Sequence, residues 1–552
     1  MKHLGRTLSL TLAAAAQFSA FAQTAADVHV GHGHVDDEPM RIRGMEGFLD
    51  YENGVQPSEA LPEPLVTIGA AALPSAMLRP YQSGAVRVEL NEPLLGLLAA
   101  IESPRVSLPL PDGRVLELAF VHAESLDAGN YTLVGQVCGV PASDVILSRV
   151  GDVMRLVVRD YEHNERFDIR YAPAPADGEA GHVLWRGGGE EGSCGNDAPG
   201  FDPQPAQPGQ PGQGGFTPRS TADPINVIDV LVLVTTQAYN FLGSWDAVYA
   251  EANSYAADFN ITCANSGSGL FMRIADVNGP GYSEDASGST DLSRLASGQA
   301  PYFPSVPAYR TRVRADTVML LRRSTWSDDG SGTTLGVAYR MTSNNTSSSV
   351  GFAVTAIDQG APEGTFTHEL GHNLGGCHHE SQGGCSNPMT GSPHGYRWSC
   401  DVGFCVHRWR DTMAYNNNDR ACSSNQRLPV YSNPNILVEV SGACPDFYIG
   451  DATANVASLV LNTRATASQW RIGSTRVWTR HNLLFAAGDG THYRPFGRLA
   501  VAANTVSGDP GEAEVLMYPG AYNEAQNFGP FVVSRPCIVK TPDGVPGTII
   551  IR

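Results

Sequence analysis

Positive charge is scarce in this sequence. Lys and Arg together number 37 against 56 Asp and Glu, which gives a formal net charge of −19 at pH 7. A chain this acidic lacks the basic surface with which proteins bind nucleic acids or anionic membranes, so both are excluded as main partners. Long apolar runs are missing too, because no segment has the ~20 apolar residues that a membrane-spanning helix needs. The sequence therefore predicts no nucleic-acid partner and no membrane span.

The amino terminus carries a shorter apolar run with a different meaning. Basic residues Lys2 and Arg6 precede the run, and small residues follow it up to Ala22. This is the pattern of a secretory signal peptide over residues 1–22, cut after Ala22. We therefore expect a secreted, extracellular protein. Its ten cysteines would meet an oxidising compartment, where disulfide bonds form.

Residues 23–200 consist of short runs broken by Gly, Pro and Asp. Five runs are typical of β-strands, so this part is predicted to be β-rich: AVRVEL, RVLELAF, YTLVGQV, DVILSRV and VMRLVVRDY. Residues 201–223 are a linker rich in Pro, Gly and Gln, which cannot bury a core. A linker behind a secreted β-rich unit indicates a cleavable propeptide. An ordinary tether between two domains is the alternative.

Residues 224–472 alternate between strand-like and helix-like patterns, which predicts an α/β unit with a mixed sheet. Residues 473–552 return to short strands separated by Pro-Gly and Asp-Gly turns. They resemble the opening rungs of a parallel β-helix, so a small β module is expected there. The fold class is therefore multidomain, with a β-rich prodomain, an α/β catalytic domain and a carboxyl-terminal β module. The strand-like runs of the α/β unit are INVIDVLVLVTT, LFMRIADV, DTVMLLRR and SVGFAVTAID, and the helix-like runs are SWDAVYAEANSYAADFN and DATANVASLVLNTRATASQWR.

The most restrictive motif in the chain is THELGHNLGGCH. His368 and His372 are four residues apart, so on a helix their imidazoles point the same way, with Glu369 beside the first. With this spacing two histidines bind zinc, and the carboxylate acts as a general base on a water molecule. Gly375 permits a sharp turn that returns His378 as a third nitrogen ligand. Three histidines leave the fourth zinc position open, which is the arrangement of a catalytic site.

Two further features follow the motif. His379 comes directly after His378 and is the alternative third ligand, although the spacing favours His378. About 35 residues after His378, the segment WRDTMAYNN contains Met413, which we expect to form an apolar floor beneath the imidazoles. Tyr415 lies two residues further on. Its hydroxyl would either reach the metal or the oxyanion, or the ring would simply pack as an aromatic.

Together these residues resemble the metzincin clan of zinc endopeptidases. Within that clan, HGYRW, RWRDTMAYN, YSNPN and NVASLVLNTRA are similar to the bacterial peptidyl-Asp metalloendopeptidase family and its reprolysin-like relatives, over roughly residues 227–471. One position departs from the family, because the relatives usually have Asp after the third histidine where this chain has His379. That Asp braces the turn, so the departure bears on family placement more than on chemistry. The resemblance implies a metzincin-like catalytic domain with one catalytic Zn²⁺ on His368, His372 and His378, Glu369 as the general base and Met413 in the Met-turn.

The resemblance also implies a mechanism and a substrate. Glu369 would assist the attack of a zinc-bound water on the scissile peptide bond, with peptides or proteins as substrates. The strand in SVGFAVTAID is expected to be the sheet edge that pairs with an extended substrate. The family cleaves on the amino side of Asp, so Arg397, Arg408 or Arg410 is a candidate to hold that carboxylate. Taken singly, each is more readily a surface or structural arginine.

A propeptide that acts as inhibitor requires a group that blocks the zinc, and a thiolate is a good fourth ligand. Cys138, in VCGVP, resembles the cysteine-switch motif of matrix metalloproteases, while Cys194, in SCGND, lies nearer the linker. The two could equally form a disulfide with each other. The catalytic unit holds seven cysteines, which Cys537 makes even, so either the last module is bonded to it or two thiols stay free. A disulfide at Cys377 would pin the turn before the third ligand.

The function predicted from these features is a secreted zinc endopeptidase made as a zymogen. The alternative is a catalytically silent protein of protease fold that binds or adheres, although no ligand or base is lost from the motif. The β-helix-like tail by itself suggests a carbohydrate-active enzyme, but it shows no paired carboxylates. His29, His32 and His34 form a tract that either binds metal or stays a solvated tail. The sequence leaves a Ca²⁺ requirement open.

Overall fold

The computed structural model describes most of the chain between residues 40 and 471. The predicted signal peptide, the linker and the early histidine tract lie outside the described residues. The described residues are 40–471 without 46, 48, 73–84, 128, 174–179, 188–192, 195–225, 328–332, 360, 383–384, 386, 403–404, 416–423 and 441–443, together with 476–479, 514–517, 520–522, 538–540 and 549–551.

The amino-terminal part forms a nine-stranded antiparallel sheet in the order β2-β3-β10-β9-β8-β7-β6-β5-β4. The predicted β-rich region is thereby confirmed, although the sequence patterns identified only five of these strands. The strands are β2 (Val66–Ala72), β3 (Val86–Leu90), β4 (Arg105–Pro109), β5 (Val115–Asp127), β6 (Asn130–Val137), β7 (Ser143–Val150), β8 (Val153–Asp160), β9 (Glu165–Ala172) and β10 (Gly181–Gly187).

One face of this sheet packs on a short helix, α2 (Glu92–Leu98). Asn91 caps the helix, since its side-chain oxygen accepts a hydrogen bond from the backbone N–H of Leu94 at 3.2 Å. Leu95 and Leu98 of α2 are fully buried against apolar residues of the sheet. The sheet is buried beyond its contact with α2, because every residue of β7 and β8 is buried. Successive side chains of a strand point to opposite faces, so these two strands are covered on both sides.

The second sheet has six strands in the order β11-β15-β16-β14-β12-β13. Strands β12, β13, β14 and β16 are parallel, and β15 runs antiparallel to β16. The predicted mixed sheet is thus present, and four of its strands come from the apolar runs seen in the sequence. The strands are β11 (Ser193–Cys194), β12 (Val227–Val234), β13 (Phe271–Asn278), β14 (Thr317–Arg322), β15 (Thr334–Ala338) and β16 (Phe352–Ala356).

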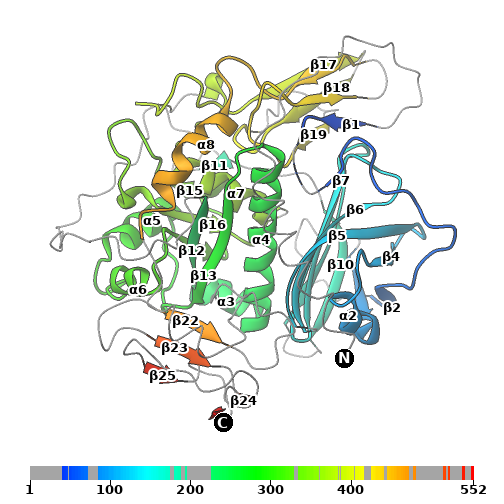
Figure 1. The fold of residues 1–552 in the computed structure, drawn as a ribbon, viewed down its shortest axis with the longest axis horizontal. Helices are drawn as coiled ribbons and strands as arrows, with labels where there is room; N and C mark the ends of the chain where they lie inside the picture. Colours follow the sequence, from blue (N-terminus) through cyan, green and yellow to red (C-terminus); the bar gives the residue numbers. More distant parts are fainter. Residues whose placement is uncertain are drawn as a thin grey trace, which may run out of the picture. The chain divides into compact units, whose positions relative to one another are not determined.

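Helices surround this sheet, and the longest of them is α4 (Trp245–Asn265). It contacts β13 of the six-stranded sheet as well as β7 and β8 of the nine-stranded sheet, so it lies between the two (Figure 1). Small residues on α4 permit this close packing, and Ala247, Ala250 and Ala252 are all buried. The remaining helical segments are α3 (Thr236–Leu242), α5 (Gly288–Ser297), α6 (Val306–Val313), α7 (Pro362–Asn373), α8 (Val456–Ala467), η2 (Ser348–Val350) and η3 (Glu380–Gln382).

Small sheets complete the described residues. An early strand, β1, pairs with β20 from far along the chain, and β20 pairs in turn with β21. Another three-stranded sheet has the order β17-β18-β19. The bounds are β1 (Arg41–Arg43), β17 (Arg397–Val402), β18 (Cys405–Arg410), β19 (Ser424–Arg427), β20 (Leu437–Glu439) and β21 (Phe447–Tyr448).

The carboxyl-terminal module is described only as five short strands in two parallel sheets, β22-β23-β25 and β24-β26. Its β-helix-like form stays a prediction. No helix among the described residues is long and apolar enough to cross a membrane. The strands are β22 (Arg476–Thr479), β23 (Glu514–Met517), β24 (Gly520–Tyr522), β25 (Ile538–Lys540) and β26 (Ile549–Ile551).

Candidate active site

The helix α7 carries the histidine motif and is anchored at both ends. Pro362 stands at its first position, where no intrahelical N–H is needed. At the other end Gly375 has a φ of 102°, which a residue with a side chain rarely adopts. Asn373 fixes this end to the neighbouring strands, because its amide nitrogen lies 2.7 Å from the carbonyl oxygen of Tyr339 and 3.1 Å from that of Phe352. The helix is thereby held against β15 and β16.

The three predicted histidines come together at the end of this helix. His368 and His372 lie on α7, and the turn at Gly375 returns His378 beside them. Their Nε2 atoms face one another, with separations of 3.1 Å between His368 and His372 and 2.9 Å between His372 and His378. The third separation, between His368 and His378, is 3.3 Å. All three side chains are buried.

The opposite ring nitrogens of two histidines are engaged by backbone oxygens. Nδ1 of His368 lies 2.8 Å from the carbonyl oxygen of Thr412, and Nδ1 of His372 lies 2.7 Å from that of Gly376. A carbonyl oxygen only accepts, so each Nδ1 carries the proton and each Nε2 presents a lone pair. Burial lowers the pKa of His372 to about 3 and holds those of His368 and His378 well below their usual range. Three neutral imidazoles with converging lone pairs fit a divalent cation such as zinc.

His379, the alternative ligand, is placed outside this cluster. Its backbone N–H donates to the side-chain oxygen of Gln382 at 3.2 Å, and its Nδ1 lies 3.0 Å from Oγ of Ser381. The group of three converging ligand atoms contains His378 and not His379. The geometry therefore favours His378 in the third position, as the spacing did.

The floor of the cluster is formed by the turn around Met413. A Cβ added at Gly371 of α7 would lie 2.3 Å from Sδ of Met413, so the methionine packs directly on the motif helix. Asp411 shapes the turn, because its carboxylate accepts hydrogen bonds from the backbone N–H groups of Met413 at 3.1 Å, Ala414 at 2.9 Å and Ser432 at 2.7 Å. This turn also presents the Thr412 carbonyl to His368. Asp411 thus positions His368 indirectly, because it shapes the turn whose Thr412 carbonyl oxygen contacts the imidazole.

Glu369 and Tyr415 flank the three histidines. Glu369 is fully buried on α7, and a Cβ added at Gly336 of β15 would lie 2.2 Å from its Oε1. The glycine therefore leaves the space that the carboxylate occupies. The hydroxyl of Tyr415 lies 2.5 Å from Nε2 of His378, and the two ring centroids are 4.1 Å apart. Tyr415 therefore borders the point where the imidazole nitrogens converge, and Glu369 follows His368 directly on α7.

A cavity of about 250 Å³ lies next to Tyr415 and His379. The hairpin β17–β18 supplies its arginines, with Arg397 opposite Arg410 and Arg408 opposite Ser399. Nη2 of Arg397 donates to Oγ of Ser381 at 2.7 Å, and Nη1 of Arg410 donates to the carbonyl oxygen of Ala414 at 2.8 Å.

Arg408 differs from the other two arginines of this cavity. It is 9% exposed, and its Nη1 has no hydrogen-bond partner in the described part of the chain. A buried guanidinium nitrogen without an acceptor is costly unless a ligand supplies one. The cavity is therefore suited to an acidic group.

The edge of the sheet differs from the sequence prediction. The run SVGFAVTAID contains β16, which lies between β15 and β14, so its prediction as the edge strand is wrong. Strand β15 lies outside it, and the two-residue strand β11 pairs with β15 in parallel register, Cys194 opposite Gly336. The error arose because β15 is short and contains Gly336, which weakens its strand pattern.

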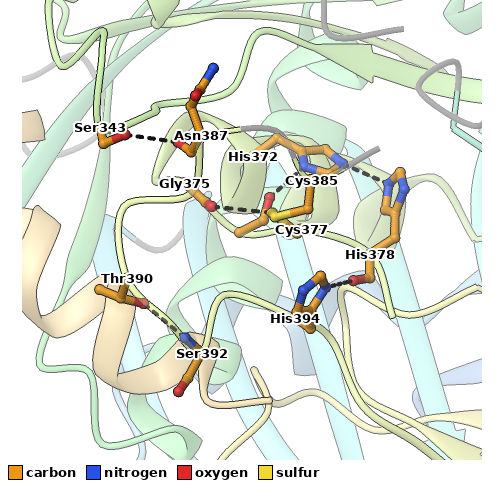
Figure 2. The surroundings of a disulfide bond; sticks show 11 residues. Ser343, His372, Gly375, Cys377, His378, Cys385, Asn387, Thr390, Ser392 and His394 are labelled. Atoms are coloured by element: carbon orange, nitrogen blue, oxygen red, sulfur yellow. Dashed lines mark hydrogen bonds between the residues drawn. A yellow bond between two sulfur atoms is a disulfide. The ribbon is translucent and has the colours of Figure 1, made fainter. Parts of the chain in front are cut away.

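Disulfide bonds hold the loops around the site. Cys377, immediately before the third histidine, is bonded to Cys385 (Figure 2), as expected for the pinned turn, and Cys400 is bonded to Cys444. Figure 2 also shows His394, whose Nδ1 lies 2.9 Å from the carbonyl oxygen of His378. Cys138 carries a free thiol, so the alternative in which it pairs with Cys194 is wrong.

Comparison with known proteins agrees with this geometry. Residues 225–427 match the reprolysin-type family model described as metallo-peptidase family M12. The match confirms the resemblance to reprolysin-like metzincins, and it supports a hydrolase that acts on peptides and uses zinc. No curated protein matched the chain.

The chain also resembles solved structures, among them one complex. It is titled "Structure of a chaperone-substrate complex" and aligns at 19% identity with a TM-score of 0.33. The alignment covers 45% of this chain and 36% of that one, so this chain spans about a third of its length. A likeness this weak carries no argument about fold or function.

Sequence reasoning missed three residues of the site. Asp411 lies inside the segment that contains Met413, and the signal that could have found it was an acid two residues before the methionine, whose side chain the structure buries. Gly336 and Asn373 act through contacts with residues distant in the sequence, which no local pattern reveals.

Proposed function

We propose that this chain is a secreted zinc endopeptidase that is made as a zymogen. The observation that carries the proposal is the convergence of three neutral imidazole nitrogens at the end of a helix that also carries a buried carboxylate and packs against β15, next to the edge of the sheet. His368, His372 and His378 would hold the zinc. When bound, the ion supplies a Lewis acid that acidifies a water and polarises the scissile carbonyl.

The chain's own residues perform the proton transfers. Glu369 accepts a proton from the attacking water and delivers it to the leaving amine. Its side chain is fully buried, which shields these proton transfers from bulk water. Tyr415 directs its hydroxyl to the point where the imidazoles converge, so it is placed to donate a hydrogen bond to the developing oxyanion.

An extended peptide would bind by strand addition to β15. This strand is the outer strand of the sheet apart from the short β11, and its middle residue, Gly336, lies against Glu369. Main-chain hydrogen bonds to an edge strand tolerate many sequences, so selectivity must come from side-chain cavities.

The cavity beside Tyr415 supports a preference for Asp on the amine side of the cut. Arg408 is the residue we assign to the substrate carboxylate, because its Nη1 has no hydrogen-bond partner among the described residues, whereas Arg397 and Arg410 each donate to a neighbouring oxygen. A guanidinium and a carboxylate form strong charge-assisted hydrogen bonds in such a site.

Latency would arise from the segment that precedes the linker. Strand β11 pairs with β15, the strand to which a substrate would add, and places Cys194 opposite Gly336. Cys138 is a weaker candidate for the zinc ligand, because it follows β6 in the nine-stranded sheet. Burial and the neighbouring Glu117 raise the pKa of the Cys138 thiol to about 12, which disfavours a thiolate. Secretion rests on the signal-peptide pattern and agrees with the two disulfides.

The test is a map of cleavage sites. The chain, cut in its linker by an inserted protease site, is incubated with a denatured proteome, and the new amino termini are sequenced. We expect termini that begin with Asp. They should be absent from a zinc-chelated sample and from the Glu369→Ala variant.

Arg408→Met tests the selectivity separately. Loss of a hydrogen bond to a charged group, worth about 1.5–3 kcal/mol, should lower cleavage before Asp by roughly 10- to 100-fold. Cleavage before other residues should change little, and Arg397→Met serves as the matched control. Cuts without Asp bias would refute the preference alone. No cuts by a zinc-loaded, linker-cut chain would favour the silent binding protein instead.

A further inference from the structure

Strand β8 presents a charged face to the catalytic part of the chain. Its alternate residues Met154, Leu156 and Val158 belong to the apolar core of the nine-stranded sheet. The residues between them therefore point to the other face, where Arg155 and Arg159 are buried. That face packs on α4.

Buried acids of α4 and α7 receive these arginines. Nε of Arg155 lies 3.3 Å from Glu251 on α4, and Nη2 of the same side chain lies 3.8 Å from Glu363 on α7. Arg170 of β9 lies 2.5 Å from Glu251. Arg166 of β9 is also paired with Glu363. The carboxylates of Glu251 and Glu363 are 1% and 0% exposed, so the sheet provides most of their neutralising charge.

A second contact of this kind reaches the metal ligands. Arg159 is paired with Asp258 of α4, and Asp258 accepts a hydrogen bond from the hydroxyl of Thr367. Thr367 directly precedes His368, while Glu363 lies in the first turn of the same helix. The sheet thus contacts the beginning of this helix directly, through Glu363, and is linked to its middle through Asp258 of α4.

Apolar contacts join the same two parts. Val150 and Val153 of the nine-stranded sheet belong to the core that surrounds the six-stranded sheet. Another core combines Ile146 and Val157 of the sheet with Ile261 of α4 and with residues between 409 and 449. Strand β1 adds a ladder to β20 in that later segment. Separation would expose apolar surface in both cores and break this ladder.

From these contacts we propose that residues 40–187 stay bound to the catalytic part after the linker is cut and form a permanent half of the mature enzyme. Activation then requires only that the segment containing β11 leave the edge of β15. The sheet acts as a positioning element for α7, and Arg155, Arg159 and Arg166 are its positioning residues. This inference rests on the zymogen part of the proposed function, while the association itself is measured without activity.

The experiment uses the full chain with a specific protease site inserted in the linker and with Glu369→Ala, which prevents self-digestion. After complete cutting, shown on a denaturing gel, the sample is analysed by native mass spectrometry and gel filtration at low and high salt. We expect both fragments to elute together with a mass equal to the sum of the two. An amino-terminal fragment that separates from a folded, zinc-binding catalytic fragment would overturn the proposal.

A variant tests the contacts themselves. Glu251→Gln removes the carboxylate shared by Arg155 and Arg170, so the cut fragments should separate at a lower urea concentration than the unmodified pair. Glu165→Gln is the matched control, because Glu165 pairs with Arg114 and Arg186 within the sheet alone. Equal urea midpoints for the two variants would contradict the assigned role. Failure of the protease proposal would leave co-elution unchanged, so the two outcomes are distinguishable.

Discussion

At the scale of single residues, the contact between Gly336 and Glu369 links the sheet edge to the candidate base. A side chain at position 336 would overlap the carboxylate, since its Cβ would fall 2.2 Å from Oε1 and 2.8 Å from Cδ. The smallest residue is thus required at the strand position nearest the base. The same position faces Cys194 across the β11–β15 ladder, so it is also where the segment proposed to block the site approaches.

Gly336→Ala should displace the Glu369 carboxylate and leave the imidazoles in place. We expect kcat to fall by about 10²-fold, the order of loss that a 1 Å misplacement of a catalytic group causes. Zinc content should stay unchanged. Gly391→Ala is the control, because a Cβ there meets nothing within 4 Å. Unchanged kcat in Gly336→Ala would show that the carboxylate does not work from this position.

The buried histidines predict how the metal-free chain responds to acid. Burial lowers the pKa of His372 to about 3 and that of His182 to about 4, so the folded chain resists protonation that the unfolded chain accepts near 6.5. The folded pKa is the lower one, so stability is full above pH 6.5 and decreases as pH falls toward 3. Urea unfolding of the chelated chain at pH 7.5 and pH 5 should show this loss, and His372→Asn should reduce it. Burial also raises the pKa of Asp411 to about 7, which opposes this loss between pH 7.5 and 5, so the test is the difference between the two chains. The same pH dependence in the parent chain and in His372→Asn would contradict the lowered pKa of His372.

At the scale of elements, the turn around Met413 shows what the sequence could and could not predict. The histidine spacing and the methionine are local patterns, and the structure brings these residues together. Asp411 was not predicted as a site residue, because its role depends on Ser432 and on the contact of Thr412 with His368. Strand β15 was missed for a related reason, since a five-residue strand that contains glycine has little pattern of its own.

Asp411→Ala should loosen this turn and weaken metal binding. The change leaves three buried N–H groups without their acceptor, at about 1–3 kcal/mol each. We expect a loss of several kcal/mol in the free energy of unfolding and a lower affinity for zinc, both measured by titration. Asp112→Ala is the comparison, because that carboxylate accepts a hydrogen bond in an exposed turn and its loss should leave the free energy of unfolding nearly unchanged. Equal losses of stability and of zinc affinity in the two variants would contradict the positioning role of Asp411.

At the scale of the whole molecule, the β-rich part and the α/β part could each be predicted from the sequence. The contacts that hold these two parts together could not. Alternating and continuous apolar runs indicated a β-rich part and an α/β part. Nothing in either pattern showed that arginines of β8 and β9 would meet acids of α4 and α7, because paired charges far apart in sequence leave no periodic signal. The domain boundaries drawn from the sequence stay predictions, and two cores include residues from both sides of the linker.

The proposed latency also concerns the whole molecule, because cutting the linker would free the segment that contains β11 to leave the edge of β15. The intact chain should cleave peptides at least about tenfold more slowly than the linker-cut chain, as expected for a strand that must be displaced before substrate binds. Zinc content should be the same in both. Equal rates in the two forms would remove the inhibitory role from the segment around β11.

The central claim is that three histidines and Glu369 form a zinc-dependent peptidase site. Zinc content and peptide hydrolysis should be measured together on the linker-cut chain and on its Glu369→Ala variant. We predict one zinc per chain in both, with hydrolysis reduced by about 10²–10⁴-fold in the variant, the range for loss of a general base. Hydrolysis that survives Glu369→Ala or complete removal of zinc would contradict the account.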